Sequence, residues 1–109
     1  MFTHICISAQ DLAASKAFYD AALTQLGVQS IGQVSDTTCV YATETGKLLV
    51  MTPSDGNSAT HSNGGTVGFQ AKTPSDVDAF HAAGLANGGQ DEGAPGHRPN
   101  APGKQYGAY

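Results

Sequence analysis

The sequence has no tryptophan, only two cysteines and few charged residues. Charged side chains make up 13% of its 109 residues, and five Lys and Arg stand against nine Asp and Glu, for a formal net charge of −4. Nucleic acids and anionic membrane surfaces are bound through clustered basic side chains. This composition therefore argues against both classes of partner.

Long apolar runs are also missing. None approaches the roughly 20 residues of a membrane span, and the first residues lack the basic and apolar regions of a secretory signal. Cys6 and Cys39 fall in strand-like runs. We therefore expect two reduced thiols, a cytoplasmic location and, from the length, a single domain over residues 1–109.

The sequence contains an internal duplication. Sliding the chain against itself by 62 positions superposes a unit at residues 3–27 on a second copy. The matched pairs are Phe18 with Phe80, Ala17 with Ala79, Ala21 with Ala83, Leu23 with Leu85, and Gly27 with Gly89. A repeat of this length that occurs twice predicts two related modules, residues 1–62 and 63–109, that share one core.

Each copy opens with an alternating segment that predicts a strand. Over residues 2–8, Ile5 and Ile7 point to one face and His4, Cys6 and Ser8 to the other. Over residues 66–72 the apolar positions alternate in the same way with Thr66, Gly68 and Gln70.

A helix is predicted to follow in each copy. In the first, Asp11 is a good N-cap and Gly27 a C-terminal stop for a helix over residues 12–26. In the second, Thr73 is the predicted N-cap, Pro74 occupies the first helical position and Asp76 lies in the first turn. The buried stripe of the second helix, which ends at residues 88–89, is predicted to contain Val77, Phe80, His81 and Leu85.

Three more strands are predicted in the first module, at residues 28–34, 37–43 and 47–52, with tight turns at 35–36 and 44–46. Residues 53–65 are rich in Ser, Asn and Gly and form the linker. Residues 90–107 allow one short strand near their start and another from Tyr106. Under the shift of 62 positions, Tyr109 corresponds to Lys47, which opens the last predicted strand of the first module. The second module is therefore predicted to lack its last strand.

This order of elements, with Asp11-Leu12, Phe18-Tyr19 and Leu26-Gly27 in the first unit, resembles the vicinal oxygen chelate superfamily of glyoxalase, bleomycin-resistance and extradiol-dioxygenase proteins. The resemblance implies an α+β fold of tandem βαβββ modules. These form an open, curved mixed sheet of half-barrels, with helices on the convex face and a small-molecule pocket on the concave face.

Metal-dependent members of that superfamily hold a divalent ion on the first and last strands of each module. The resemblance places the first ligand position at His4, the fourth-strand position at Val50, the one opening the second module at Thr66, and the last beyond residue 109. A catalytic metal usually needs about three protein ligands. The resemblance therefore implies no complete metal site and no cofactor, and a bound Zn, Ni, Mn or Fe is the alternative.

The predicted pocket residues are His4, Cys6, Ser8, Val50, Thr66, Gln70 and Arg98. His4 is either the one metal ligand or pocket base, or a structural histidine held by a hydrogen bond. Cys6 is read as a small buried thiol in preference to a nucleophile. Arg98, together with Lys104, either recognises an anionic substrate group from a lid or lies in a simple loop.

Five further aromatic side chains receive structural interpretations. His81 is expected to pack on the helix stripe, and Tyr106 and Tyr109 to pack in the unfinished strand. The loop residues His61 and His97 are expected to be solvated. No catalytic residue is assigned.

Three functions remain open. The first is a metal-free small-molecule-binding protein of the bleomycin-resistance type. The second is a glyoxalase-like lyase, isomerase or thiol transferase whose metal site is completed by a missing C-terminal strand or a partner subunit. The third is an incomplete copy without activity. A homodimer is expected under the first two, because an unpaired sheet edge favours pairing between chains.

Overall fold

The computed structural model describes residues 1–109 with the exception of the Lys104 side chain. The chain divides into two compact units. One contains Met1–Ala17 and Val28–Gly68, and the other contains Phe18–Gly27 and Phe69–Tyr109.

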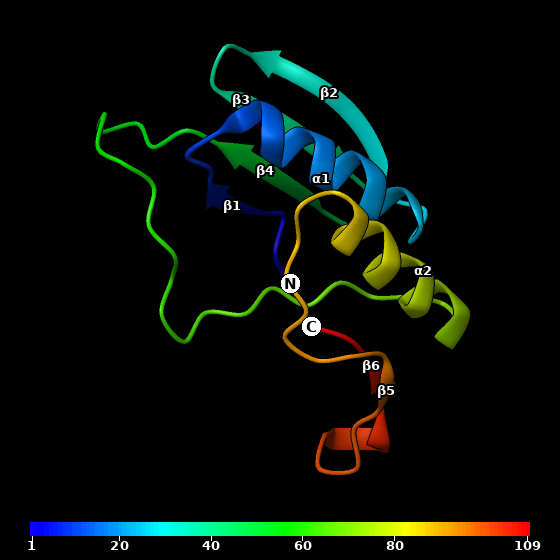
Figure 1. The fold of residues 1–109 in the computed structure, drawn as a ribbon. Helices are drawn as coiled ribbons and strands as arrows, with labels where there is room; N and C mark the ends of the chain where they lie inside the picture. Colours follow the sequence, from blue (N-terminus) through cyan, green and yellow to red (C-terminus); the bar gives the residue numbers. More distant parts are fainter. The chain divides into compact units, whose positions relative to one another are not determined.

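The first unit is built on a four-stranded sheet (Figure 1). Its strands are β1 (His4–Ser8), β2 (Gln29–Ser35), β3 (Thr38–Ala42) and β4 (Lys47–Met51), in the spatial order β1-β4-β3-β2. β1 runs parallel to β4, and the other neighbours are antiparallel. The predicted α+β class with an open mixed sheet is confirmed, and each strand lies within two residues of its predicted bounds.

One face of this sheet carries the buried side chains. Leu48 and Val50 of β4 and Cys39 and Tyr41 of β3 are at most 6% exposed. The Tyr41 hydroxyl donates to the backbone carbonyl of Lys16, at 3.3 Å, on the first half of helix α1 (Leu12–Thr24). Residues 12–17 of the helix therefore cover this face, which is what the apolar alternation of the strands requires.

Both helices begin where the sequence predicts, whereas α1 ends at Thr24, two residues before its predicted end at Leu26. The Asp11 carboxylate accepts the backbone N–H of Ala14, at 2.9 Å, and caps α1. Helix α2 (Pro74–Ala86) opens with a complete capping box. The Thr73 side chain accepts the Asp76 N–H, and the Asp76 side chain accepts the Thr73 N–H. These short-range bonds satisfy donors that the first helical turn leaves unpaired, so they form irrespective of what surrounds the helix.

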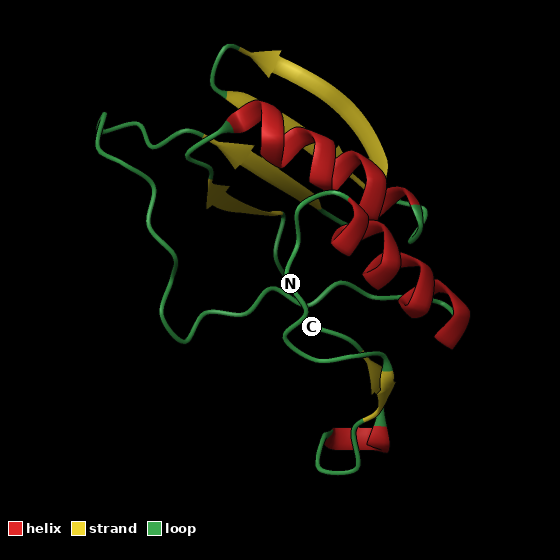
Figure 2. Cartoon of the chain, viewed as in Figure 1, coloured by secondary structure: helices red, strands yellow, loops and turns green.

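The predicted strand over residues 66–72 is wrong. The chain from residue 52 to residue 73 has no strand and is drawn as loop throughout (Figure 2). In the part of the chain that the structure describes, β1 pairs with β4, whereas residues 66–72 pair with no strand. Alternation without a partner does not form a ladder.

The second unit combines α2 with a small C-terminal hairpin. Strands β5 (Gly96–His97) and β6 (Tyr106–Gly107) pair antiparallel, and a 3₁₀ turn, Pro102–Lys104, lies between them. The strand predicted from Tyr106 is confirmed.

The buried stripe of α2 differs from its prediction. The side chain of Phe80 packs against Phe69, with ring centroids 6.1 Å apart, and His81 is half-buried. Leu85 is 43% exposed, however, and the buried residue of α2 is Gly84. The ring of Phe18 lies against Gly84, since a Cβ added there would be only 3.3 Å from Phe18 Cε2. Helical spacing predicted a broad apolar stripe, but the close contact is made through the glycine.

Neither helix in the part of the chain that the structure describes has the length and apolar character needed to cross a membrane.

Candidate functional site

Strand β1 presents His4, Cys6 and Ser8 on one face of the sheet, and all three are exposed. They alternate with Ile5 and Ile7, which share the opposite face. This is the arrangement that the alternation predicts. Cys6 is nevertheless exposed and not buried as expected, because helix α1 covers the other face of the sheet.

Apolar side chains from β3 and β4 continue the face that carries Cys6. In the strand register Cys6 pairs with Leu49, and Leu49 with Val40, so the three residues form one row across the sheet. The next row contains Ser8, Met51 and Thr38. Val40, Leu49 and Met51 are all half-buried. We call the surface formed by these six residues and His4 the open face.

His4 lies at one end of the open face. Its ring Nδ1 is 2.9 Å from the hydroxyl Oγ1 of Thr3, and its partner across the sheet is Lys47. The hydroxyl can donate to the ring or accept from it, depending on the tautomer. In either case the contact fixes one nitrogen of the imidazole and leaves Nε2 as the group that can meet a ligand.

Val50 does not belong to the open face. Its register partners are Ile7 and Cys39, on the face that α1 covers, and its exposure is only 1%. A shift of one residue along a strand moves a side chain to the other face. The assignment of the fourth-strand position to Val50 is corrected accordingly, because the β4 residues that share a face with His4 are Lys47, Leu49 and Met51.

Thr66 and Gln70 are exposed on the segment that forms no strand. Thr66 belongs to the first compact unit and Gln70 to the second. Their assignment to a common pocket face depended on the alternation of a strand, so it stays a prediction.

Arg98 is held by its own loop. Its Nη2 donates to the carbonyl of Ala94 at 2.7 Å and to that of Gly93 at 3.4 Å, and its guanidinium lies 5.4 Å from the centroid of the Tyr109 ring. Bonds to several backbone carbonyls make Arg98 an organiser of the C-terminal loop. The side chain of Lys104, its predicted companion, lies outside the described residues.

The second unit contains two polar pairs that sequence reasoning missed. The Tyr106 hydroxyl donates to Asp78 Oδ1 at 2.6 Å, and His81 Nε2 lies 3.2 Å from Asp91 Oδ1. The hydrogen bond to Asp78 raises the pKa of the Tyr106 phenol. Asp78 and His81 are three residues apart and so lie on one face of α2. That spacing puts two polar side chains on the same helix face, but it does not indicate Tyr106 or Asp91 as their partners.

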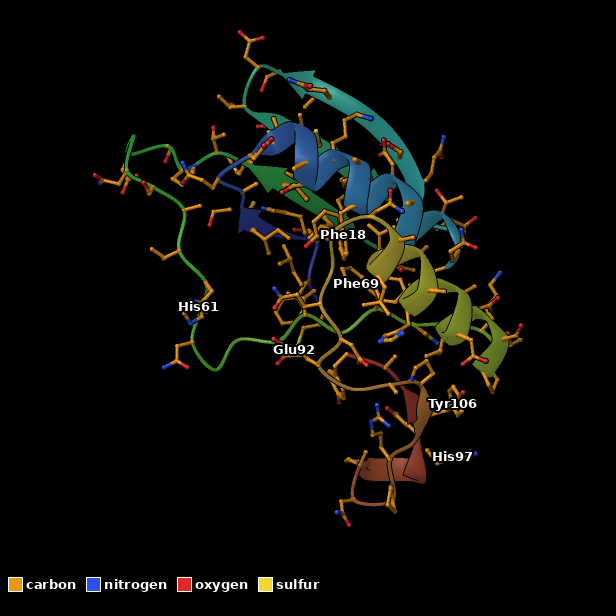
Figure 3. The ribbon with its side chains drawn as sticks, in the orientation of Figure 1. Phe18, His61, Phe69, Glu92, His97 and Tyr106 are labelled. Carbon is orange, nitrogen blue, oxygen red and sulfur yellow. The ribbon has the colours of Figure 1, made fainter. Side chains whose placement is uncertain are left out.

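The remaining histidines are exposed, as predicted. His97 pairs with Tyr106 across the hairpin, and the two rings meet edge to face with centroids 5.3 Å apart (Figure 3). His61 is on the long loop between β4 and α2 (Figure 3). Among the described side chains, no three of His, Cys, Asp and Glu come together in a way that could hold a metal ion.

Comparison with known proteins assigns the family. The family model described as Glyoxalase/Bleomycin resistance protein/Dioxygenase superfamily matches residues 1–106. A glyoxalase/bleomycin resistance protein from Albidiferax ferrireducens T118 is 44% identical, with a TM-score of 0.86 over 92% of this chain and 81% of that one.

More distant solved structures share the fold. The hypothetical protein SA1046 from S. aureus has a TM-score of 0.69 at 18% identity over 99% of this chain and 81% of that one. A lactoylglutathione lyase from Agrobacterium tumefaciens has a TM-score of 0.59 at 21% identity over 97% of this chain and 81% of that one. A search of curated proteins found no match. The family model and the 44% identical structure together show that the chain belongs to the glyoxalase/bleomycin resistance protein/dioxygenase superfamily.

Proposed function

We propose that this chain binds a small molecule on the open face of its sheet and works without a complete metal site. The observation that supports this is the composition of that face. Its centre is apolar and half-buried, through Val40, Leu49 and Met51, and its β1 side is polar, through His4 and Ser8. Ligand sites are commonly apolar surfaces with a few polar groups that fix the orientation of the ligand.

The arrangement suits a flat or amphipathic molecule. Its apolar surface would lie on the row formed by Cys6, Leu49 and Val40, while a polar edge would reach the His4 ring or the Ser8 hydroxyl. Complete burial of an exposed apolar side chain is worth about 1.5–3 kcal/mol, and Leu49, which is already half-buried, would contribute part of that to affinity.

A binding experiment tests this proposal. Flat amphipathic compounds are screened by thermal shift, and hits are measured by calorimetry with the native chain, Leu49→Gln and Val34→Gln. Val34 is a matched control because it is an apolar strand residue, 56% exposed, on the far edge strand β2.

We expect Leu49→Gln to weaken binding about tenfold or more, while Val34→Gln binds as the native chain does. If Leu49→Gln binds normally, the ligand site is not the open face. Circular dichroism on both variants checks that the sheet is intact.

A metal-dependent lyase, isomerase or thiol transferase is the second candidate, and one contact favours it. The Thr3 hydroxyl holds Nδ1 of His4, and metal-binding histidines generally have their other nitrogen fixed by such a bond. A divalent Zn, Ni, Mn or Fe ion would polarise substrate oxygens as a Lewis acid. His4 is a single ligand, so the remaining ligands would come from a further strand or a partner subunit.

Metal analysis separates the two candidates. The purified chain, His4→Ala and the control His61→Ala are examined for metal content and titrated with Ni(II), Zn(II) and Mn(II). Stoichiometric metal that is lost in His4→Ala and kept in His61→Ala would overturn the metal-free proposal and lead to glyoxalase and thiol-transfer assays. Equal, negligible binding by all three proteins would overturn the second candidate in the form in which a second copy of this chain completes the metal site.

A homodimer is part of both proposals. Among the described strands β1 lies at the edge of its sheet and pairs with β4 alone, and an unpaired edge presents N–H and C=O groups to another chain. Sedimentation equilibrium measures the state directly, and a monomer at all concentrations would contradict the proposed dimer while leaving the ligand experiment unaffected.

A further inference from the structure

The long loop between β4 and α2 contains one of two Asn–Gly pairs in the sequence. These pairs are Asn63–Gly64, in the loop, and Asn87–Gly88, at the end of α2. We infer that Asn63 is a site of spontaneous deamidation in the folded protein and that Asn87, which has the same neighbour in sequence, is protected by its place on the helix.

The reaction needs only the chain and water. The backbone nitrogen of Gly64 attacks Cγ of Asn63 and forms a C–N bond, while the bond from Cγ to Nδ2 breaks. Nδ2 leaves as ammonia after it takes up the amide proton of Gly64. Water then opens the five-membered succinimide at either carbonyl, which gives aspartate or isoaspartate without oxidation or reduction. Glycine favours the attack because it has no Cβ to obstruct the ring.

The surroundings of Asn63 leave this reaction unhindered. Asn63 is exposed, and none of the hydrogen bonds among the described residues uses its side chain. The pair occupies the middle of a β-turn closed by one bond, from the Gly65 N–H to the Ser62 carbonyl at 2.8 Å, with Gly64 at φ 84°. A single exposed bond of this kind opens readily.

The surroundings of Asn87 oppose the same reaction. Its side-chain Nδ2 donates to the Ala83 carbonyl at 2.8 Å, and its backbone N–H donates to the Gly84 carbonyl at 3.2 Å. Asn87 is the C-cap of α2, so both bonds tie it to the last turn of the helix. To react, the side chain must leave Ala83 and turn toward the nitrogen of Gly88. Breaking the hydrogen bond to Ala83 before the attack should lower the deamidation rate at Asn87 by about fivefold.

Deamidation would change the loop chemically. Each event adds one negative charge to a chain whose formal net charge is −4. The isoaspartate product also routes the backbone through the former side chain, which lengthens the turn between Ser62 and Gly65 by one methylene. Both changes fall in the connection between β4 and the second copy of the repeat.

Peptide mapping by mass spectrometry tests the inference with an internal control. The full native chain is aged at neutral and mildly alkaline pH, and conversion of amide to acid is followed at both positions in the same digests. Isoaspartate is identified by enzymatic methylation, and the succinimide is trapped with hydroxylamine. A parallel sample is aged in denaturant, where both pairs are unfolded. The variant Gly64→Ala supplies a chain in which the attacking nitrogen is hindered.

We expect Asn63 to deamidate at least about fivefold faster than Asn87 in the native chain, and the two rates to become similar in denaturant. Gly64→Ala should slow reaction at Asn63 and leave Asn87 unchanged. Equal native rates, a faster reaction at Asn87, or a native rate at Asn63 far below its denatured rate would overturn the inference.

Discussion

The two copies of the repeat form the same kind of helix but not the same kind of strand. Helices α1 and α2 each span 13 residues and each has its predicted side-chain cap. The opening segment of the first copy is strand β1, whereas the corresponding residues from 66 to 70 form no strand. Helical bonds are made within a segment, but a strand must find its bonds on another segment. Local sequence therefore determines the helices, and the available partners determine the strands.

The same divergence reaches the side chains that the helices bury. Leu23 of the first copy is 1% exposed, while its counterpart Leu85 is 43% exposed. Two leucines at equivalent positions of the repeat thus differ in how far their side chains are exposed to solvent.

The largest expected effect comes from truncating these two leucines. Leu23→Ala should lower the free energy of unfolding by about 2–5 kcal/mol, because it removes a fully buried side chain and leaves a cavity. Leu85→Ala should cost less than about 1 kcal/mol, since much of its side chain already meets water. Urea denaturation of both variants measures the difference. Similar losses of unfolding free energy in the two variants would mean that the two leucine side chains are buried equally, which would contradict the structure.

The glycines that end the repeat unit give the next effect. A Cβ at Gly89 would lie 2.8 Å from the Gly84 carbonyl oxygen and 2.9 Å from Phe18 Cε2. Gly27 has open space but a φ of 74°. Gly89→Ala should cost about 1–3 kcal/mol through overpacking, and Gly27→Ala about 1–2 kcal/mol through backbone strain.

Asparagine distinguishes the two causes, because it tolerates a positive φ better than alanine does. In thermal or urea denaturation, Gly27→Asn should recover part of the stability that Gly27→Ala loses. Gly89→Asn should recover none. Recovery at both positions would show that crowding at Gly89 is not what constrains it.

Much of the fold could be predicted from the sequence, and the reasons are local. Asp11, Thr73 and Pro74 indicated the helix starts, and Gly27 the end of α1, because caps and stops act within one turn. The alternation of β1 indicated which of its side chains share a face. The segment at residues 66–72 shows the limit, since its alternation is as regular but its pairing depends on residues far along the chain.

The cap of α2 gives a smaller effect. Thr73→Ala removes an acceptor for the Asp76 N–H and breaks the capping box, which should cost about 1 kcal/mol. Ser75→Ala, in the first turn of the same helix and also exposed, is the matched control and should be nearly neutral. Denaturation followed by circular dichroism measures both. An equal effect in both variants would mean that the cap does not stabilise the helix.

The candidate site was only partly predictable, for a different reason. His4, Cys6 and Ser8 follow from a period of two along one strand. Val50 was assigned to the wrong face because the register between β1 and β4 depends on how the two strands pair in the sheet. The sequence of either strand alone does not determine it. The pair Tyr106 and Asp78 joins residues 28 positions apart, which no local pattern reports.

The smallest expected effect concerns the two tyrosines of the second unit whose pKa values are raised for different reasons. Burial raises the pKa of Tyr19, whereas the hydrogen bond to Asp78 is the main cause for Tyr106. An unfolded tyrosine titrates near pH 10. Since the folded pKa of Tyr106 is higher, its contribution to stability is fully present below about pH 10 and is lost as the pH rises through the folded value.

Removal of the acceptor should separate the two tyrosines. In Asp78→Asn the pKa of Tyr106 should fall toward its ordinary value, because the phenol no longer donates to a carboxylate, while the pKa of Tyr19 stays raised by burial. Spectrophotometric titration of tyrosinate measures this, with Tyr106→Phe to assign the signal and the exposed-turn variant Asp36→Asn as the control. If Asp78→Asn titrates like Asp36→Asn, the bond does not persist in solution. The C-terminal hairpin would then be held to α2 by other contacts, such as that between His81 and Asp91.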